Sequence, residues 1–171
     1  MTDLGQRLRR HPFVAEMSDD HISTLEGCGL SYLSFEPGDK LVREGKDADS
    51  CFLIDRGDVG LEMYVDRAQT HTLQVVHAGE IVGWSWLLPP YLGAYDATAA
   101  TPVTAMRIDA SLLREAMEND REFGYAMLVR VCRVAVSRLE ATRREFLDVY
   151  QHETPGPGVP PVPTGDMRRV G

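Results

Sequence analysis

The feature that most constrains this chain is a series of short alternating runs between residues 30 and 109. In the clearest of them, Val59–Asp66 and Val103–Ile108, successive residues alternate between two classes, as the two faces of a strand require. Glycine, proline and aspartate separate the runs, at 37–39, 45, 57–58, 79 and 93. Runs of this length and spacing predict a closed or sandwiched antiparallel sheet, such as a jelly roll.

Helical periodicity flanks the predicted roll on both sides. Before it, apolar residues recur at helical spacing in 11–29, with Ser18 or Asp19 as the expected cap. After it, the pattern predicts a short helix and then a long one that ends near Tyr150. The expected caps are Asp109 or Ser111 for the first, and Asn119 or Asp120 for the second.

These patterns divide the chain into one domain and two terminal segments. We expect an N-terminal extension over 1–10, a domain over 11–150 and a disordered, Pro/Gly-rich tail over 151–171. Within the domain, the roll covers 30–109 and a C-terminal helical pair covers 110–150. The predicted fold class is therefore mainly β with flanking helices.

The long helix carries an apolar seam. Its residues alternate at spacings of four and three, which is typical of a coiled-coil dimer; they include Leu128, Cys132, Ala135, Leu139, Thr142 and Phe146. A second stripe, Met127, Val131 and Val134, is expected to pack on the chain's own domain. The seam predicts a homodimer or a different partner chain, and the alternative is that the whole helix docks on its own domain.

Charge and composition exclude several classes of protein. Asp and Glu number 26 against 18 Lys and Arg, so the net charge of −8 disfavours nucleic acid as a partner. No apolar run reaches the ~20 residues of a membrane helix, and the N-terminus lacks the apolar core of a secretory signal. We therefore expect a cytoplasmic protein. Its cysteines, Cys28, Cys51 and Cys132, are widely spaced and are expected to be thiols in a reducing compartment.

Neither metal binding nor catalysis has support in the sequence. His71 and His77 would lie on the same face of a strand but about 20 Å apart, too far to share one ion. Ser85 lacks the second glycine of a nucleophile elbow, and the chain has no Walker-type phosphate loop. We expect a protein that is not an enzyme and binds no metal.

The order of the turn-bearing segments resembles a known family. The segments are 35–39, 41–45, 51–59, 79–83 and 97–99. Together they are similar to the cyclic nucleotide-binding domain of the catabolite-activator and protein kinase A regulatory-subunit superfamily, over about residues 11–148. The resemblance implies a phosphate-binding cassette between Gly79 and Ala99, whose amides face a cyclic phosphate. Carried onto this chain, it implies a ligand site formed by Gly83, Trp84, Ser85, Trp86, Leu87, Tyr95, Asp96, Ala97 and Thr98.

The cassette departs from the family pattern at two informative positions. Trp84 stands where the family has a glutamate that accepts a hydrogen bond from the ribose, and an indole offers no comparable acceptor. No lysine or arginine occurs between Ala68 and Met106, so the arginine that pairs with the phosphate is missing. A charge-assisted bond of this kind contributes roughly 1.5–3 kcal/mol, or one to two decades of affinity. Asp96 is expected to add negative charge near the phosphate.

Two interpretations of the pocket remain open. In the first, it binds cAMP or cGMP weakly, or through a basic residue from elsewhere, such as Arg43, Arg56 or Arg67. In the second, it is filled by its own side chains or takes another small planar ligand. A cyclic nucleotide is the only cofactor-like ligand that the resemblance suggests.

The resemblance also bears on the output of the domain. Many relatives carry a helix-turn-helix after the long helix, whereas only about 20 residues follow Tyr150 here, and they are rich in proline and glycine. We expect a standalone regulatory or adaptor domain without a DNA-reading helix.

Overall fold

The computed structural model describes residues 3–66 and 69–152. Two four-stranded sheets form the roll, and every strand pair is antiparallel. The first sheet has the order β1 (Ser31–Phe35), β8 (Val103–Asp109), β3 (Ser50–Arg56), β6 (Ile81–Val82). The second has the order β2 (Lys40–Val42), β7 (Asp96–Ala99), β4 (Val59–Asp66), β5 (Gln69–Val76). The predicted mainly-β roll with flanking helices is confirmed.

The turn between β3 and β4 shows why glycine separates these strands. Gly57 adopts a φ of +86°, and a Cβ there would lie 2.3 Å from the carbonyl oxygen of Pro102. Both the left-handed backbone and the close approach exclude a side chain. The glycine signal seen in the sequence therefore reflects a contact between two distant turns.

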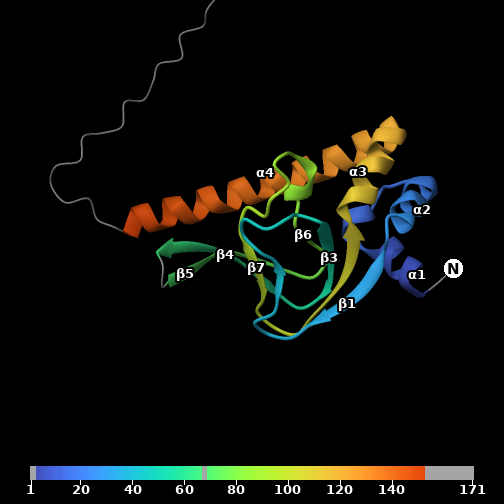
Figure 1. The fold of residues 1–171 in the computed structure, drawn as a ribbon. Coiled ribbons are helices and arrows are strands. Elements are labelled where there is room, and N and C mark those ends of the chain that lie inside the picture. Colours follow the sequence, from blue (N-terminus) through green and yellow to red (C-terminus); the bar gives the residue numbers. More distant parts are fainter. Residues whose placement is uncertain (1–2, 67–68, 153–171) are drawn as a thin grey trace, which may run out of the picture.

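Helices precede and follow the strands in the sequence. Helix α1 (Asp3–Arg10), the 3-10 turn η1 (Pro12–Val14) and helix α2 (Asp19–Gly27) precede it. Helix α3 (Ala110–Asn119) and the long helix α4 (Arg121–His152) follow, and α4 runs across the molecule past the edges of the strands (Figure 1). Of the predicted tail, residues from 153 onward lie outside the described part of the chain.

For each of the helices α2, α3 and α4, one of the two residues predicted as its N-terminal cap is the cap in the structure. Ser18 accepts a hydrogen bond from the His21 amide at the start of α2. Asp109 accepts from the Ser111 and Leu112 amides in the first turn of α3. Asp120 accepts from the Glu122 and Phe123 amides at the start of α4. In each case a short oxygen-bearing side chain satisfies amides that have no partner within the helix.

The N-terminal segment is part of the domain rather than an extension beyond it. Leu4 and Leu8, four residues apart, lie on one face of α1, and Leu8 is fully buried in a core shared with α2 and α4. The second stripe of α4 enters the same core, since Met127 and Val131 are buried there and Val134 packs against it, as predicted. A separate apolar cluster, from Leu41 to Ala105, joins the two sheets.

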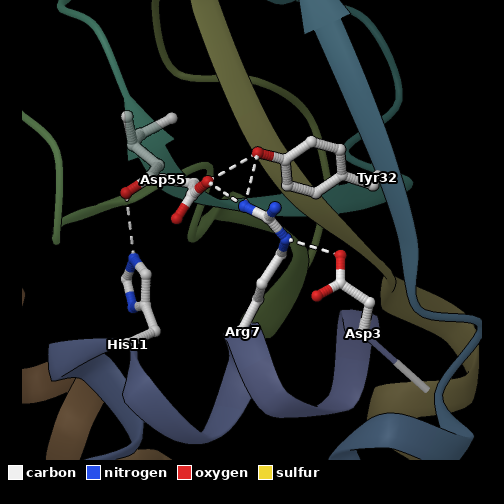
Figure 2. Close-up of polar contacts among 6 residues, drawn as sticks. Asp3, Arg7, His11, Tyr32 and Asp55 are labelled. Carbon is white, nitrogen blue, oxygen red and sulfur yellow. Dashed lines mark hydrogen bonds and ion pairs between the residues drawn. The ribbon is translucent and has the colours of Figure 1, made fainter.

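A polar network fastens α1 to the first sheet (Figure 2). Arg7 Nη1 donates to the Asp55 carboxylate at 3.2 Å, and the Tyr32 hydroxyl donates to the same oxygen at 2.5 Å. Arg7 Nε also donates to Asp3 at 3.1 Å. Because Asp55 lies on β3 and Tyr32 on β1, these bonds tie the helix to two strands of one sheet.

His11 completes this attachment as a buried neutral imidazole. The Phe13 amide donates to its Nδ1 at 3.2 Å, so the ring proton lies on Nε2, which donates to the Ile54 carbonyl at 3.0 Å. Burial lowers the pKa of His11. A second ring proton would place Nδ1–H against the Phe13 N–H.

His11 should make the stability of the fold depend on pH. Below the ordinary histidine pKa of about 6.5, the unfolded chain binds a proton that the folded chain disfavours, so the free energy of unfolding falls. Between about pH 7.5 and about pH 5.5 this loss can reach about 1.4 kcal/mol. Urea unfolding at both pH values should show a smaller loss for His11→Gln than for the wild type. Identical losses in the two proteins would contradict the assignment.

Candidate functional site

The segment that corresponds to the predicted cassette is held tightly against the β2–β3 region. It comprises β6, Gly83, Trp84, the 3-10 turn η2 (Ser85–Leu87) and the loop to β7. Gly83 has a φ of +77°, and a Cβ there would lie 3.1 Å from the Ser50 carbonyl oxygen. At the other end, the Gly93 amide donates to the Lys46 carbonyl, and the Gly93 carbonyl accepts from the Gly45 amide. These contacts fix the backbone of the cassette at both ends.

The predicted ligand residues divide among different environments. Trp86 is fully buried in the core beside the helices, and Ala97 is fully buried between the sheets. Gly83 and Ser85 line a small cavity of about 180 Å³ beside β2, and Leu87 lines another beside α3 and α4. The Thr98 hydroxyl donates to Glu62 at 2.8 Å. The structure therefore does not bring the nine residues together around one cavity.

Asp96 forms part of a buried ion pair. Its side chain is 4% exposed and pairs with Lys40. Its other oxygen accepts a hydrogen bond from the Glu44 amide at 2.8 Å. The charge that the sequence analysis placed beside a phosphate is thus compensated by a lysine on β2.

Trp84 and Tyr95 do share a cavity, and it lies between the roll and α4. Its volume is about 320 Å³. Two strands, the cassette and the long helix form its walls, with the side chains of Leu61, Leu73, Gln74, Trp84, Tyr95, Ala135, Arg138, Leu139 and Thr142. We call it the α4 cavity. Its lining is mostly apolar and aromatic, and its volume lies in the range of small-molecule sites.

Arg138 is the basic residue of this cavity, and the sequence analysis missed it. Its Nη1 donates to the Tyr95 hydroxyl at 2.8 Å, and its Nη2 donates to the Ile81 carbonyl. Among the residues that the structure describes, no acidic side chain pairs with it. In the sequence it merely precedes Leu139 of the seam, and only the packing of α4 across the roll brings it to the cassette.

The basic residues proposed from the sequence lie elsewhere. Arg43 lines the small cavity beside β2, and Arg56 is exposed at the end of β3. Arg67 lies outside the described residues. Neither Arg43 nor Arg56 lines the α4 cavity.

Tyr95 remains a neutral phenol in this setting. Burial raises its pKa, and the neighbouring Arg138 guanidinium acts in the opposite direction. The Trp84 indole N–H also lowers the pKa of the phenol, and its buried Nε1 has no hydrogen-bond partner in the described structure. Two donor groups, the guanidinium and the indole N–H, therefore lie near one phenolic oxygen.

The remaining titratable groups do not form a reactive centre in the part of the chain that the structure describes. Burial raises the pKa of the Cys28 thiol to about 11 and that of Cys51 to about 12, so both are protonated at neutral pH. His77 is exposed, and a hydrogen bond with Asp58 raises its pKa. Within residues 3–66 and 69–152, no cluster of three His, Cys, Asp or Glu side chains is placed to hold a metal ion. The helices described there are too short or too polar to cross a bilayer.

Comparisons with known proteins agree with this architecture. The sequence profile of the family described as "Cyclic nucleotide-binding domain" matches residues 32–120. A candidate cyclic nucleotide-binding protein from Geobacter metallireducens GS-15 is 29% identical, with a TM-score of 0.70 over 81% of this chain and 99% of that one. The N-terminal domain of a transcriptional regulator from Streptomyces coelicolor is 26% identical, with a TM-score of 0.61 over 79% and 94%.

More distant regulatory proteins share the fold. The regulatory subunit of a cAMP-independent protein kinase A from Trypanosoma brucei is 20% identical, with a TM-score of 0.66 over 82% of this chain and 49% of that one. A search of curated proteins gave no significant match. The resemblance and the fold class predicted from the sequence are confirmed. Because the family profile covers just over half of the residues and the fold agrees along the roll, the chain belongs to the cyclic nucleotide-binding domain family.

Proposed function

We propose that the chain is a non-enzymatic, cytoplasmic regulatory domain that binds a small molecule in the α4 cavity and transmits its presence through α4. One observation carries the proposal: α4 itself forms a wall of the cavity, through Ala135, Arg138, Leu139 and Thr142. Any molecule that enters must contact this helix as well as the cassette. A ligand shifts a conformational equilibrium only through contacts that differ between the two states, and such contacts are available here.

Cyclic nucleotides are expected to bind this cavity weakly. Family membership supports a cyclic nucleotide as the ligand. However, Trp84 stands in place of the glutamate that would accept from the ribose, and the loop that contains Tyr95 lacks the arginine that would pair with the phosphate. The fold itself does not decide the matter, since it is shared with the regulatory subunit of a protein kinase described as cAMP-independent. Each missing charge-assisted bond lowers affinity by roughly one to two decades.

A second candidate is an interaction module with a degenerate pocket. It is favoured by Trp86, which is fully buried in the helix-side core, so this part of the cassette serves packing. Such a module would bind its partner whether or not a small molecule is present.

Amide hydrogen exchange with about 5 mM cAMP separates the two candidates, because weak binding requires a high ligand concentration. Under the proposal, exchange slows in the cassette and in residues 135–142 of α4. Helix α2 lies away from the cavity and is the internal control. Protection of the cassette without protection of 135–142 would contradict transmission through α4, and unchanged exchange throughout would contradict cyclic nucleotide binding in this cavity.

We further propose that α4 passes the response to a second copy of the chain. Its outer face exposes apolar side chains: Leu128 is 42% exposed and Val136 55%. Together with Cys132, these two residues line a groove of about 600 Å³. Ala135, Leu139 and Thr142 of the predicted seam line the α4 cavity instead, and the Phe146 side chain lies outside the described part. Exposed apolar residues four positions apart lie on one helix face, and such a face supports a helix-to-helix contact.

A further inference from the structure

The polar groups of the α4 cavity form an unusual set, because donors outnumber acceptors around one point. The Arg138 guanidinium contacts the Tyr95 oxygen from one side, and the Trp84 indole N–H lies close to the same oxygen. The buried Trp84 Nε1 has no acceptor among the described residues. An unsatisfied buried donor is costly, so this corner of the cavity favours a ligand that brings acceptor atoms.

The charge of the same corner is also uncompensated. Arg138 is half-buried, and its described hydrogen bonds go to two neutral oxygens, the Tyr95 hydroxyl and the Ile81 carbonyl. These bonds occupy two of the five N–H donors of a guanidinium. Because the ion pairs of the described residues do not include Arg138, an anionic group would be its first charged partner.

The rest of the lining has a different character. Leu61 and Leu73 come from the strands, and Ala135 and Leu139 come from α4. Together with the faces of Trp84 and Tyr95, they offer apolar and aromatic contact to a flat molecule. A ribose needs several hydrogen-bond partners, and among the lining residues only Gln74, Thr142 and Tyr95 bear neutral polar oxygens.

We propose that the preferred ligand of the α4 cavity is a small, flat, apolar carboxylate, with its carboxylate held by Arg138 and the Trp84 indole N–H and its body between the aromatic rings and the leucines. This inference rests on the proposed function, since it names the ligand class of the same site. Because the Trp84 Nε1 is buried, the carboxylate reaches both donors by displacing the Tyr95 hydroxyl that lies beside them. The ligand thereby binds the cassette and α4 through a single group.

Calorimetric titration of the full chain with 2-naphthoate and 2-naphthamide tests the inference. The two probes share their shape and apolar surface, and only the first carries a negative charge. We expect 2-naphthoate to bind at least about tenfold more tightly than the amide. In the Arg138→Met variant, the dissociation constant of 2-naphthoate should rise about ten- to a hundredfold, while that of 2-naphthamide changes little. Arg143→Met is the matched control, because Arg143 is an exposed residue of α4 that does not line the cavity.

A second variant keeps the test decisive if Arg138→Met loosens α4. Trp84→Phe removes the indole N–H but retains an aromatic ring, so it should weaken 2-naphthoate several-fold and 2-naphthamide less, because the amide oxygen is a neutral acceptor. Equal affinity for the two probes in the wild type, or no binding of 2-naphthoate, would overturn the inference. If cAMP still protected residues 135–142 in that case, the proposed function would stand without this ligand class; if neither probe nor cAMP acted, both would fall.

Discussion

The double substitution Trp84→Glu with Tyr95→Arg should raise the affinity for cAMP by about a hundredfold or more. The introduced carboxylate would accept a hydrogen bond from the ribose hydroxyl, and the introduced guanidinium would pair with the phosphate. Each charge-assisted bond contributes roughly 1.5–3 kcal/mol. The backbone that must present these groups is already in place, since Gly83 and Gly93 pin the cassette to the β2–β3 region.

The single substitutions should not share this gain equally. The Arg138 guanidinium lies 2.8 Å from the Tyr95 hydroxyl, so Tyr95→Arg alone would set two positive groups side by side. The carboxylate introduced by Trp84→Glu offsets that repulsion, and we expect the two changes together to exceed the sum of their separate effects. Isothermal titration with cAMP measures all four proteins. Micromolar binding by the wild type, or a double variant that binds no better than the wild type, would contradict our account of the cassette.

Substituting Leu128 by glutamate should abolish self-association through α4. The Leu128 side chain lies on the outer groove, where a second copy would bury it, and burying a carboxylate in an apolar contact is strongly unfavourable. We expect the dissociation constant of the dimer to rise by at least about a hundredfold. Leu112→Glu is the control: Leu112 on α3 and Leu128 are both 42% exposed, so both variants add the same charge at an equally exposed leucine.

Sedimentation velocity of the three proteins gives the result, and Cys132 gives a second readout. Cys132 is exposed, whereas Cys28 and Cys51 are buried. In a parallel, in-register seam, Cys132 would meet the same residue of its partner, and mild oxidation should cross-link the wild type and Leu112→Glu but not Leu128→Glu. A wild type that is monomeric at about 50 μM, or a Leu128→Glu variant that associates as strongly as the wild type, would contradict the proposed seam.

The elements whose signals are local could be predicted from residues close together in the chain. Strand alternation indicated the roll, and short oxygen-bearing side chains indicated the starts of α2, α3 and α4. The stripe of Met127 and Val131 indicated the buried side of α4. Helix α1 could not be assigned to the domain from the sequence, because eight residues with two apolar positions give a weak periodic signal, although Leu8 is fully buried.

The composition of the site depended on contacts between distant residues. Trp84 and Trp86 are two positions apart, yet one lines the α4 cavity and the other fills the core. Lys40 compensates Asp96 from 56 positions away, and Arg138 reaches Tyr95 from 43 positions away. Sequence by itself determined the secondary structure and the family, because periodicity, caps and turns act over a few residues. Only the tertiary structure decided which side chains meet, because the direction of α4 across the roll brings a cation to a cassette that has none of its own.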